Sequence, residues 1–263
     1  MDFIRELAAA YRGYVNAFRF IDQQRFWKIF VIPGICSLII ASFVIWFAWK
    51  TSDTLTQYAI IKFKVGGDEF YFNSFLEFIV VTFVRGIILF IYIKIYRYLI
   101  LILLSPEFSY ITSLVMSLST EERQRFRIKS YFNDIWRSVK TAFKNFVLEI
   151  LLTVLILLLA IILTWTLPLI PFIIFIIEAY FFGFAMADYR NEFFNIPARE
   201  SKKIIKSHKG AIIGNGIIFN ISLLIPIFGV LFAPTLAVIA AGLTMNEVEE
   251  QKDIYVHSVH QSV

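Results

Sequence analysis

Two cations directly before a long apolar run are the first residues that could bind a ligand. Arg25 and Lys28 precede the apolar run that begins at Phe30. The start of a helix presents backbone N–H groups and the positive end of the helix dipole, which favour an anion. A cation on either side would complete a site for a sulfate-like anion. The same cations also fit a second role, as cytoplasmic anchors of a membrane helix.

A single arginine inside a second apolar run is the other candidate. Arg85 lies within the run, where a cation is expensive in lipid, so it should face protein or water and contact a carboxylate. Glu149, Glu178 and Asp188 are the candidate partners, and Glu178 is the first choice because it also lies in an apolar run. The pair Arg85 and Glu178 could line an anion path, or it could be a buried ion pair with a structural role.

The sequence predicts neither an enzyme nor a cofactor. His208, His257 and His260 lie in a polar loop and tail, and no Ser, Cys or His has a convincing base partner. A Gly-rich phosphate loop is absent. Cys36 is the only cysteine, which excludes an internal disulfide, and we expect no metal site because metal-ligand spacing is missing.

The composition is that of an α-helical membrane protein with several spans. Hydrophobic residues make up 59% of the 263-residue chain and charged residues only 17%, below the usual quarter or so. The net charge of +5 resides in the loops, which points to anionic lipid headgroups and topology instead of nucleic acid. We expect one membrane domain over residues 1–250, followed by a polar C-terminal tail over residues 251–263.

Two apolar runs, Phe30–Trp49 and Phe75–Leu104, are long enough for transmembrane helices. The polar segment Thr51–Asn73, which holds Gly66-Gly67, separates them. Before the first run, Phe3–Phe20 is predicted to be amphipathic, with Phe3, Leu7, Tyr11, Tyr14 and Phe18 on or near one face and arginines elsewhere. That helix could lie in the headgroup region or pack on the rest of the protein. Ser105-Pro106 is predicted to end the second run.

Two further apolar stretches are each broken by proline. Phe146–Leu167 and Phe172–Ala187 flank one break, and Ala211–Ile225 and Pro234–Met245 flank the other. The second pair of arms, roughly 22 and 18 Å as helix, is too short to cross comfortably, which predicts a re-entrant hairpin. The first pair is longer and could span fully. The residues expected to allow close packing of the last hairpin are Gly210, Gly214, Gly216, Pro226, Gly229 and Pro234.

The distribution of Lys and Arg predicts the topology. Only residues 50–73 are poor in cations, so this loop should be external, while both termini and Asp188–Gly210 should be cytoplasmic. Two spans with two hairpins that enter from the cytoplasmic side satisfy this distribution. Six full spans satisfy it as well.

The ordered motifs resemble the CysZ sulfate-permease family, which groups with the eukaryotic etoposide-induced transmembrane proteins. Asp188-Tyr189 is followed eight residues later by Pro197, which resembles the family's Asp-Tyr-Pro…Val-Pro stretch. Residues 214–242 resemble its final hairpin, Ser105-Pro106 follows the long second run, and charge precedes an apolar Ile-Pro in Arg25–Pro33. Together these matches cover most of the chain in the family's order.

The resemblance implies a fold and a function. It implies two long membrane helices, two hemi-penetrating hairpins, a homo-oligomer in the cell inner membrane, and uptake of sulfate that feeds cysteine synthesis. The chain departs from the family at three places. Arg25-Phe26-Trp27-Lys28 stands at the family's Gly-Leu/Ile-Arg-Arg turn, which is associated with sulfate binding, so only the cation at Lys28 aligns. Leu167–Ile170 with Pro171 replaces a Gly-x-Gly-Gln turn, and Arg190 replaces the proline after Asp-Tyr.

Sequence and resemblance together predict a multi-pass membrane transport protein or channel for a small inorganic anion such as sulfate. The fold predicted is all-α, with two long transmembrane helices, two Pro-broken hairpins that are re-entrant, and an amphipathic N-terminal helix. The alternative is a membrane protein that transports nothing and organises partners or lipid.

Overall fold

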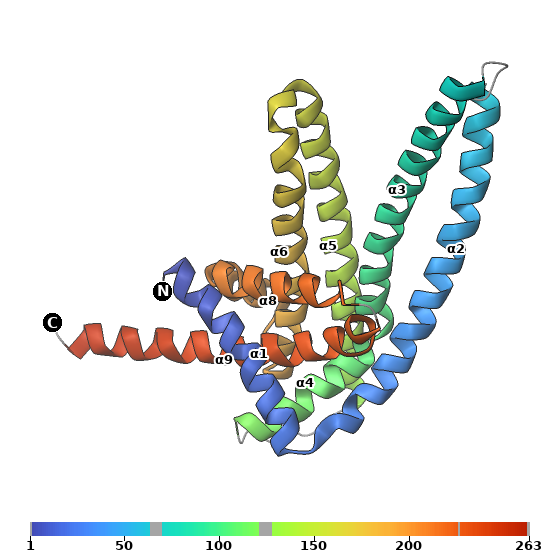
Figure 1. Ribbon diagram of the computed structural model, residues 1–263. Coiled ribbons are helices and arrows are strands. Elements are labelled where there is room, and N and C mark those ends of the chain that lie inside the picture. The colour runs from blue at the N-terminus through green and yellow to red at the C-terminus, as the bar shows by residue number, and fades with distance from the viewer. Residues whose placement is uncertain (1, 64–69, 121–127, 226, 262–263) are drawn as a thin grey trace. The chain divides into compact units, whose positions relative to one another are not determined.

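The computed structural model describes residues 2–63, 70–120, 128–225 and 227–261, and these residues are almost entirely helical, with no strand among them (Figure 1). The chain divides into two compact units. One comprises Cys36–Ile100, and the other comprises Met1–Ile35 together with Leu101–Val263. Each unit is described by itself. Five helical segments of the described chain are long and apolar enough to cross a membrane: Phe26–Tyr58, Glu77–Leu103, Trp136–Ile162, Thr164–Phe193 and Phe228–Gln251.

The unit Cys36–Ile100 is built from most of two long helices, α2 (Val31–Phe63) and α3 (Phe70–Leu103). The hydroxyls of Thr51 and Tyr92 lie 2.9 Å apart, which joins the two helices. With 33 and 34 residues, both helices exceed the 20 or so needed to span a bilayer, so a spanning arrangement would require them to tilt or to project beyond it.

Both helices run into the segment that was predicted to be a loop. The polar segment Thr51–Asn73 is partly helical, because α2 continues to Phe63 and α3 begins at Phe70. Gly66-Gly67 lies outside the described residues. The predicted break at Ser105-Pro106 is confirmed, since α3 ends at Leu103 and a new helix starts at Ser105 with Pro106 in its first turn.

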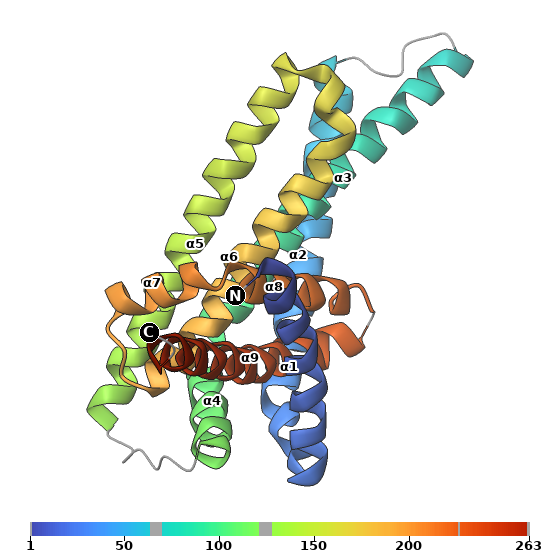
Figure 2. The same ribbon diagram turned by 90° about the vertical axis from the view of Figure 1, so that its left-hand side faces the viewer.

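The larger unit packs its helices around α6. Its elements are α1 (Phe3–Gln23), η1 (Phe26–Phe30), α4 (Ser105–Ser119), α5 (Ile128–Ile162), η2 (Thr164–Leu169), α6 (Ile170–Phe193), α7 (Ala198–Ser207), α8 (Lys209–Ser222) and α9 (Phe228–Gln261). Helix α6 contacts α4, α5, α8 and α9, and every residue from Ala185 to Phe193 is buried. Figures 1 and 2 show that α8 and α9 run crosswise to the α5–α6 hairpin.

The two Pro-broken pairs differ in how closely their helices match the predicted arms. In the first, α5 and α6 have 35 and 24 residues, joined by η2 with Pro168 inside it. In the second, α8 has 14 residues, close to the predicted short arm. The prediction that the second arm ends at Met245 is wrong, because α9 continues for 34 residues with Pro234 inside it. The residues 251–261 assigned to a polar tail are therefore the last turns of α9.

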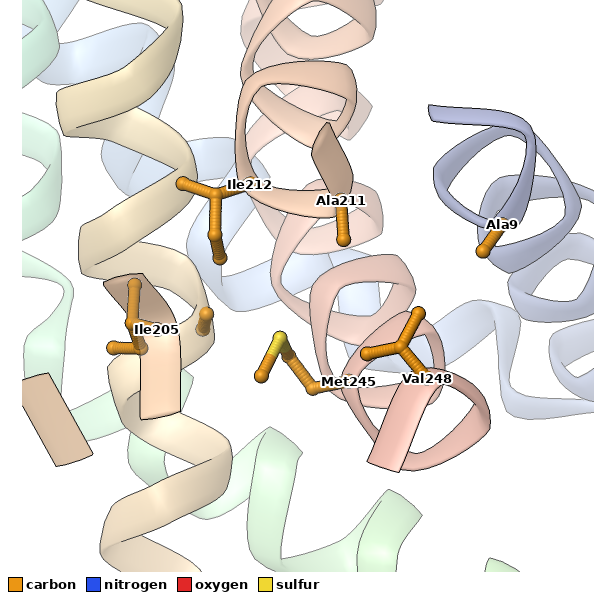
Figure 3. Packing of buried hydrophobic residues seen from close by; sticks show 7 residues of the cluster. Ala9, Ile205, Ala211, Ile212, Met245 and Val248 are labelled. Atoms are coloured by element: carbon orange, nitrogen blue, oxygen red, sulfur yellow. The ribbon is translucent and has the colours of Figure 1, made fainter. Parts of the chain in front are cut away.

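Helix α1 is amphipathic as predicted, but the face that it buries is made of small residues. Ala9, Ala10, Gly13 and Ala17 are buried in its contact with α8 and α9. Figure 3 shows Ala9 in one cluster with side chains of α7, α8 and α9, namely Ile205, Ala211, Ile212, Met245 and Val248. Most of the aromatic and large apolar side chains expected to form one face are exposed, namely Phe3, Leu7, Tyr11 and Phe18, whereas Tyr14 is buried. Helix α1 thus packs on the protein and still offers an aromatic stripe to its surroundings.

The residues proposed for close packing lie at several different contacts. Gly210 and Gly214 face α1, near Glu6 and Ala10 respectively. Gly216 faces α6, where a Cβ on Gly216 would lie 1.8 Å from the carbonyl oxygen of Ala179. The other three are distributed as follows: Gly229 lies beside Ser222 and Leu223, Pro234 is inside α9, and Pro226 falls outside the described residues.

Candidate functional site

The turn that holds Arg25 and Lys28 has a defined conformation. Arg25 adopts left-handed dihedrals, φ 54° and ψ 36°, directly before η1. The edge of Trp27 meets the ring of Phe18 on α1 with centroids 5.6 Å apart, and Phe30 packs on Phe232 of α9 at 5.3 Å. Aromatic contacts on both sides therefore fix the turn to the larger unit. Both cationic side chains are exposed, so an anion could reach them from outside the unit.

Arg85 pairs with Asp53, which is not among the predicted partners Glu149, Glu178 and Asp188. Its Nη2 lies 3.2 Å from Oδ1 of Asp53, and its guanidinium lies 5.8 Å from the ring centroid of Trp49. Asp53 was assigned to a loop, so its place on α2 was missed. Glu178 is buried on α6 in the other unit. A contact between Arg85 and Glu178 would join the two units and stays a prediction.

The residues around Arg85 bear on whether its side chain is buried or half-exposed. Trp46, Trp49 and Lys50 have the residue types that mark a membrane interface. Asp53 follows them by one helical turn on α2, and Arg85 reaches both Asp53 and Trp49. The side chains of Arg85 and Asp53 are 48% and 44% exposed, so this ion pair is half open. The pair therefore lies at the level of the interface markers on α2.

A buried polar network at the C-terminal end of α6 was not predicted. Arg137 of α5 donates through Nη2 to Oδ1 of Asp188 at 2.7 Å, and Ser201 of α7 donates to the same oxygen. Arg137 also donates through Nη1 to the carbonyl oxygen of Ile196, in the turn between α6 and α7. Asp188 is only 6% exposed as a side chain, so its charge is compensated inside the protein.

Two neighbours of Asp188 extend this network to other helices. Glu192 accepts from Ser138 of α5 at 2.6 Å and from Ser109 of α4 at 3.3 Å. Arg190 donates to Asn246 and Glu249 of α9, each at 2.7 Å. The end of α6 thus ties α4, α5, α7 and α9 together. The signal that could have revealed the network is the polar run 188–192, which directly continues an apolar helix.

These helices define an all-α membrane protein with several apolar segments of spanning length. The family model described as Sulfate transporter CysZ/Etoposide-induced protein 2.4 matches residues 14–234, which is most of the chain. The chain therefore belongs to this family, and the resemblance found in the sequence is confirmed. The comparison with curated proteins gives no match.

The backbone of Arg25 can be compared with the turn that the family resemblance leads us to expect. Arg25 adopts the left-handed conformation that glycine adopts most readily. This backbone would suit the glycine that the sequence resemblance expects at this position. A cation now occupies the position, about one turn before the aligned cation Lys28.

Proposed function

We propose that this protein is a transport protein or channel that moves a small inorganic anion, sulfate first, across the membrane. Family membership over most of the chain carries the proposal. The exposed turn of Arg25 and Lys28, fixed at the start of the first apolar helix, supports it with a local site. The Arg25 guanidinium and the Lys28 ammonium would hold the anion beside the N–H groups of the turn.

The proposed arrangement places α2 and α3 across the membrane and treats α5–α6 as a re-entrant hairpin. Residues 150–177 hold no charged side chain, and the turn between the arms exposes Ile162, Trp165 and Phe172. Side chains of that composition are suited to lipid better than to water. The backbone of the turn would then need neighbouring protein groups or water for its polar atoms. We further propose a homo-oligomer in the inner membrane with both termini cytoplasmic, as the cation distribution predicts.

The test is uptake of labelled sulfate into proteoliposomes, with chloride as the comparison anion. Wild type should carry sulfate faster than liposomes without protein. The variant Arg25→Gln/Lys28→Gln should lose about 1.4 kcal/mol of binding or more, a tenfold fall at low sulfate. The matched control is Lys203→Gln/Lys209→Gln, which removes two exposed cations from α7 and α8 and should keep the wild-type rate.

Each outcome has a separate meaning. If the folded Arg25→Gln/Lys28→Gln variant transports like wild type, the site is elsewhere. If wild type moves neither anion, transport itself is wrong and the scaffold function takes its place. The buried network fits either function, because Asp188, Glu192 and Arg190 use their charges to hold helices together.

A further inference from the structure

The larger unit contains a basic cavity that the proposed transport function does not use. It has a volume of about 360 Å³ and lies between α5, α6 and α7. Lys140 and Lys144 line it from α5, and Lys202 and Lys206 line it from α7. Each pair is spaced by four residues, so each pair lies on one face of its helix. Four cations from two helices distant in sequence therefore converge on one hollow.

The cavity carries an excess of positive charge. Among its lining residues the one acid is Asp188, whose carboxylate accepts hydrogen bonds from Arg137 and Ser201. The four lysines thus share the cavity lining with a single carboxylate, which another cation already neutralises. Thr141 and Asn145 add further polar groups to the wall. An anion would enter this cavity favourably, and salt would weaken its binding by screening.

The opposite end of the cavity is apolar. Leu148 follows Lys140 and Lys144 on the same face of α5, and the exposed Leu151 and Leu155 continue beyond it toward the hairpin turn. On α6, Tyr180 and Phe184 line the cavity, and the half-exposed Ile173 and Ile176 lie farther along the same helix in that direction. The surface therefore changes from cationic to apolar along the hairpin. A free inorganic anion would use only the cationic part.

We infer that this cavity binds the phosphate of an anionic phospholipid, with an acyl chain along the apolar surface of α5 and α6. The lysines at the predicted cytoplasmic end match a negatively charged headgroup, and basic hollows between membrane helices suit such lipids. Lys144 and Lys202 would approach the phosphate from opposite sides, one from each helix. The inference stands independently of anion transport, because none of its residues belongs to the Arg25–Lys28 turn.

The experiment counts lipids bound to purified full-length protein. The protein in neutral detergent is titrated with short-chain phosphatidylglycerol or phosphatidylcholine, and bound lipid is measured by native mass spectrometry. Wild type should bind phosphatidylglycerol at least tenfold more tightly than phosphatidylcholine. Lys202→Gln/Lys206→Gln should remove that preference. Lys203→Gln/Lys209→Gln has the same net charge and lies outside the cavity lining, so it should stay within twofold of wild type.

A second variant and a competition with free anions complete the test. If Lys202→Gln/Lys206→Gln does not fold, Lys140→Gln/Lys144→Gln removes the cations of the other wall and should give the same loss. Equal weakening by the control pair would overturn the inference, and so would equal binding of the two lipids. Inorganic phosphate and sulfate are each added as competitors. Displacement of the lipid at equal concentration would show a site for free oxyanions and reject the lipid.

Discussion

The Glu6 carboxylate on α1 accepts a hydrogen bond from the backbone N–H of Gly210, with 2.9 Å between Oε2 and the nitrogen. Gly210 lies in the first turn of α8, where N–H groups lack partners within the helix and the dipole favours a negative charge. The other oxygen of Glu6 lies 2.9 Å from Nδ1 of His208. Both side chains are buried, so one carboxylate from the N-terminal helix caps a helix that begins more than 200 residues later in the chain.

Replacement of this carboxylate should destabilise the larger unit. Glu6→Ala leaves the N–H of Gly210 and the ring of His208 without their buried partner, at a cost of about 1–3 kcal/mol per stranded group. Glu6→Gln keeps an acceptor for Gly210 and should cost less. The free energy of unfolding in mild detergent measures both. Glu250→Ala, at an exposed acid on α9, is the control, and a loss there equal to that of Glu6→Ala would contradict the capping role.

The ion pair of Arg137 and Asp188 should be strongly coupled. The two side chains are 17% and 6% exposed, and removal of one partner from a buried pair costs about 3–5 kcal/mol. Arg137→Met and Asp188→Asn should each destabilise the protein, and the double variant should lose less than the sum of the two. Unfolding free energies of the four proteins form the thermodynamic cycle. Additive losses would show that the pair contributes nothing beyond its separate residues.

The contact between Gly216 and α6 predicts an asymmetric response to added methyl groups. A Cβ at Gly216 would strike the backbone of Ala179, which cannot move without shifting a helix. Gly216→Ala should therefore cost about 1–3 kcal/mol through overpacking. At Gly86 of α3, a Cβ would meet no heavy atom within 4 Å in the described structure. Gly86→Ala should stabilise the helix by up to about 1 kcal/mol, and a loss at both sites would reject the packing argument.

Hydropathy predicted where the apolar helices lie, but it did not predict their ends. Residues 51–63 are polar enough to suggest a loop, yet they contain no proline or glycine to stop α2. Pro234 was expected to start the last arm, whereas α9 begins at Phe228 and accommodates Pro234 because the residues around it, from Ala233 to Ala241, are buried. Tertiary packing thus outweighed a local signal worth about 3 kcal/mol in an isolated helix.

The contacts between residues far apart in the chain could not be predicted from the sequence. Large side chains dominate an amphipathic pattern, and the sequence left open whether α1, with Phe3 and Tyr11 on one face, lies in the headgroup region or packs on the protein. The structure buries Ala9 and Ala10, because small residues let helices approach closely. The union of Arg137 with Asp188, 51 residues apart, depends on the whole fold. Asp188 was singled out by the family motif, whereas Arg137 was not.

Cysteine labelling tests the predicted topology and the hairpin together. In a Cys36→Ala background, Gln57→Cys on α2 should react with a membrane-impermeant maleimide from outside, and Lys203→Cys on α7 only after permeabilisation. Thr164→Cys, in the turn between α5 and α6, should react only with a membrane-soluble maleimide, because a re-entrant turn stays within the bilayer. Labelling of Thr164→Cys from the same side as Gln57→Cys would instead show that the hairpin crosses fully.

Because Arg25 has a left-handed backbone, replacing it with glycine removes the charge from the proposed anion site while keeping the conformation of the turn. A residue with a Cβ pays about 1–2 kcal/mol in this region, and glycine does not. The Arg25 side chain is exposed, so Arg25→Gly loses little packing and should raise the free energy of unfolding by about 1 kcal/mol. Lys28→Gly is the matched control, because Lys28 lies inside η1, where glycine should destabilise by about 0.5–1 kcal/mol.

Sulfate uptake by the same two variants then isolates the role of the cation. Arg25→Gly is expected to fold better than wild type and to transport sulfate more slowly, because the turn keeps its shape and loses a charge beside the helix start. Lys28→Gly should lose both stability and flux. Uptake by Arg25→Gly at the wild-type rate would mean that the left-handed turn and Lys28 suffice. In that case Arg25 contributes no binding energy to the anion.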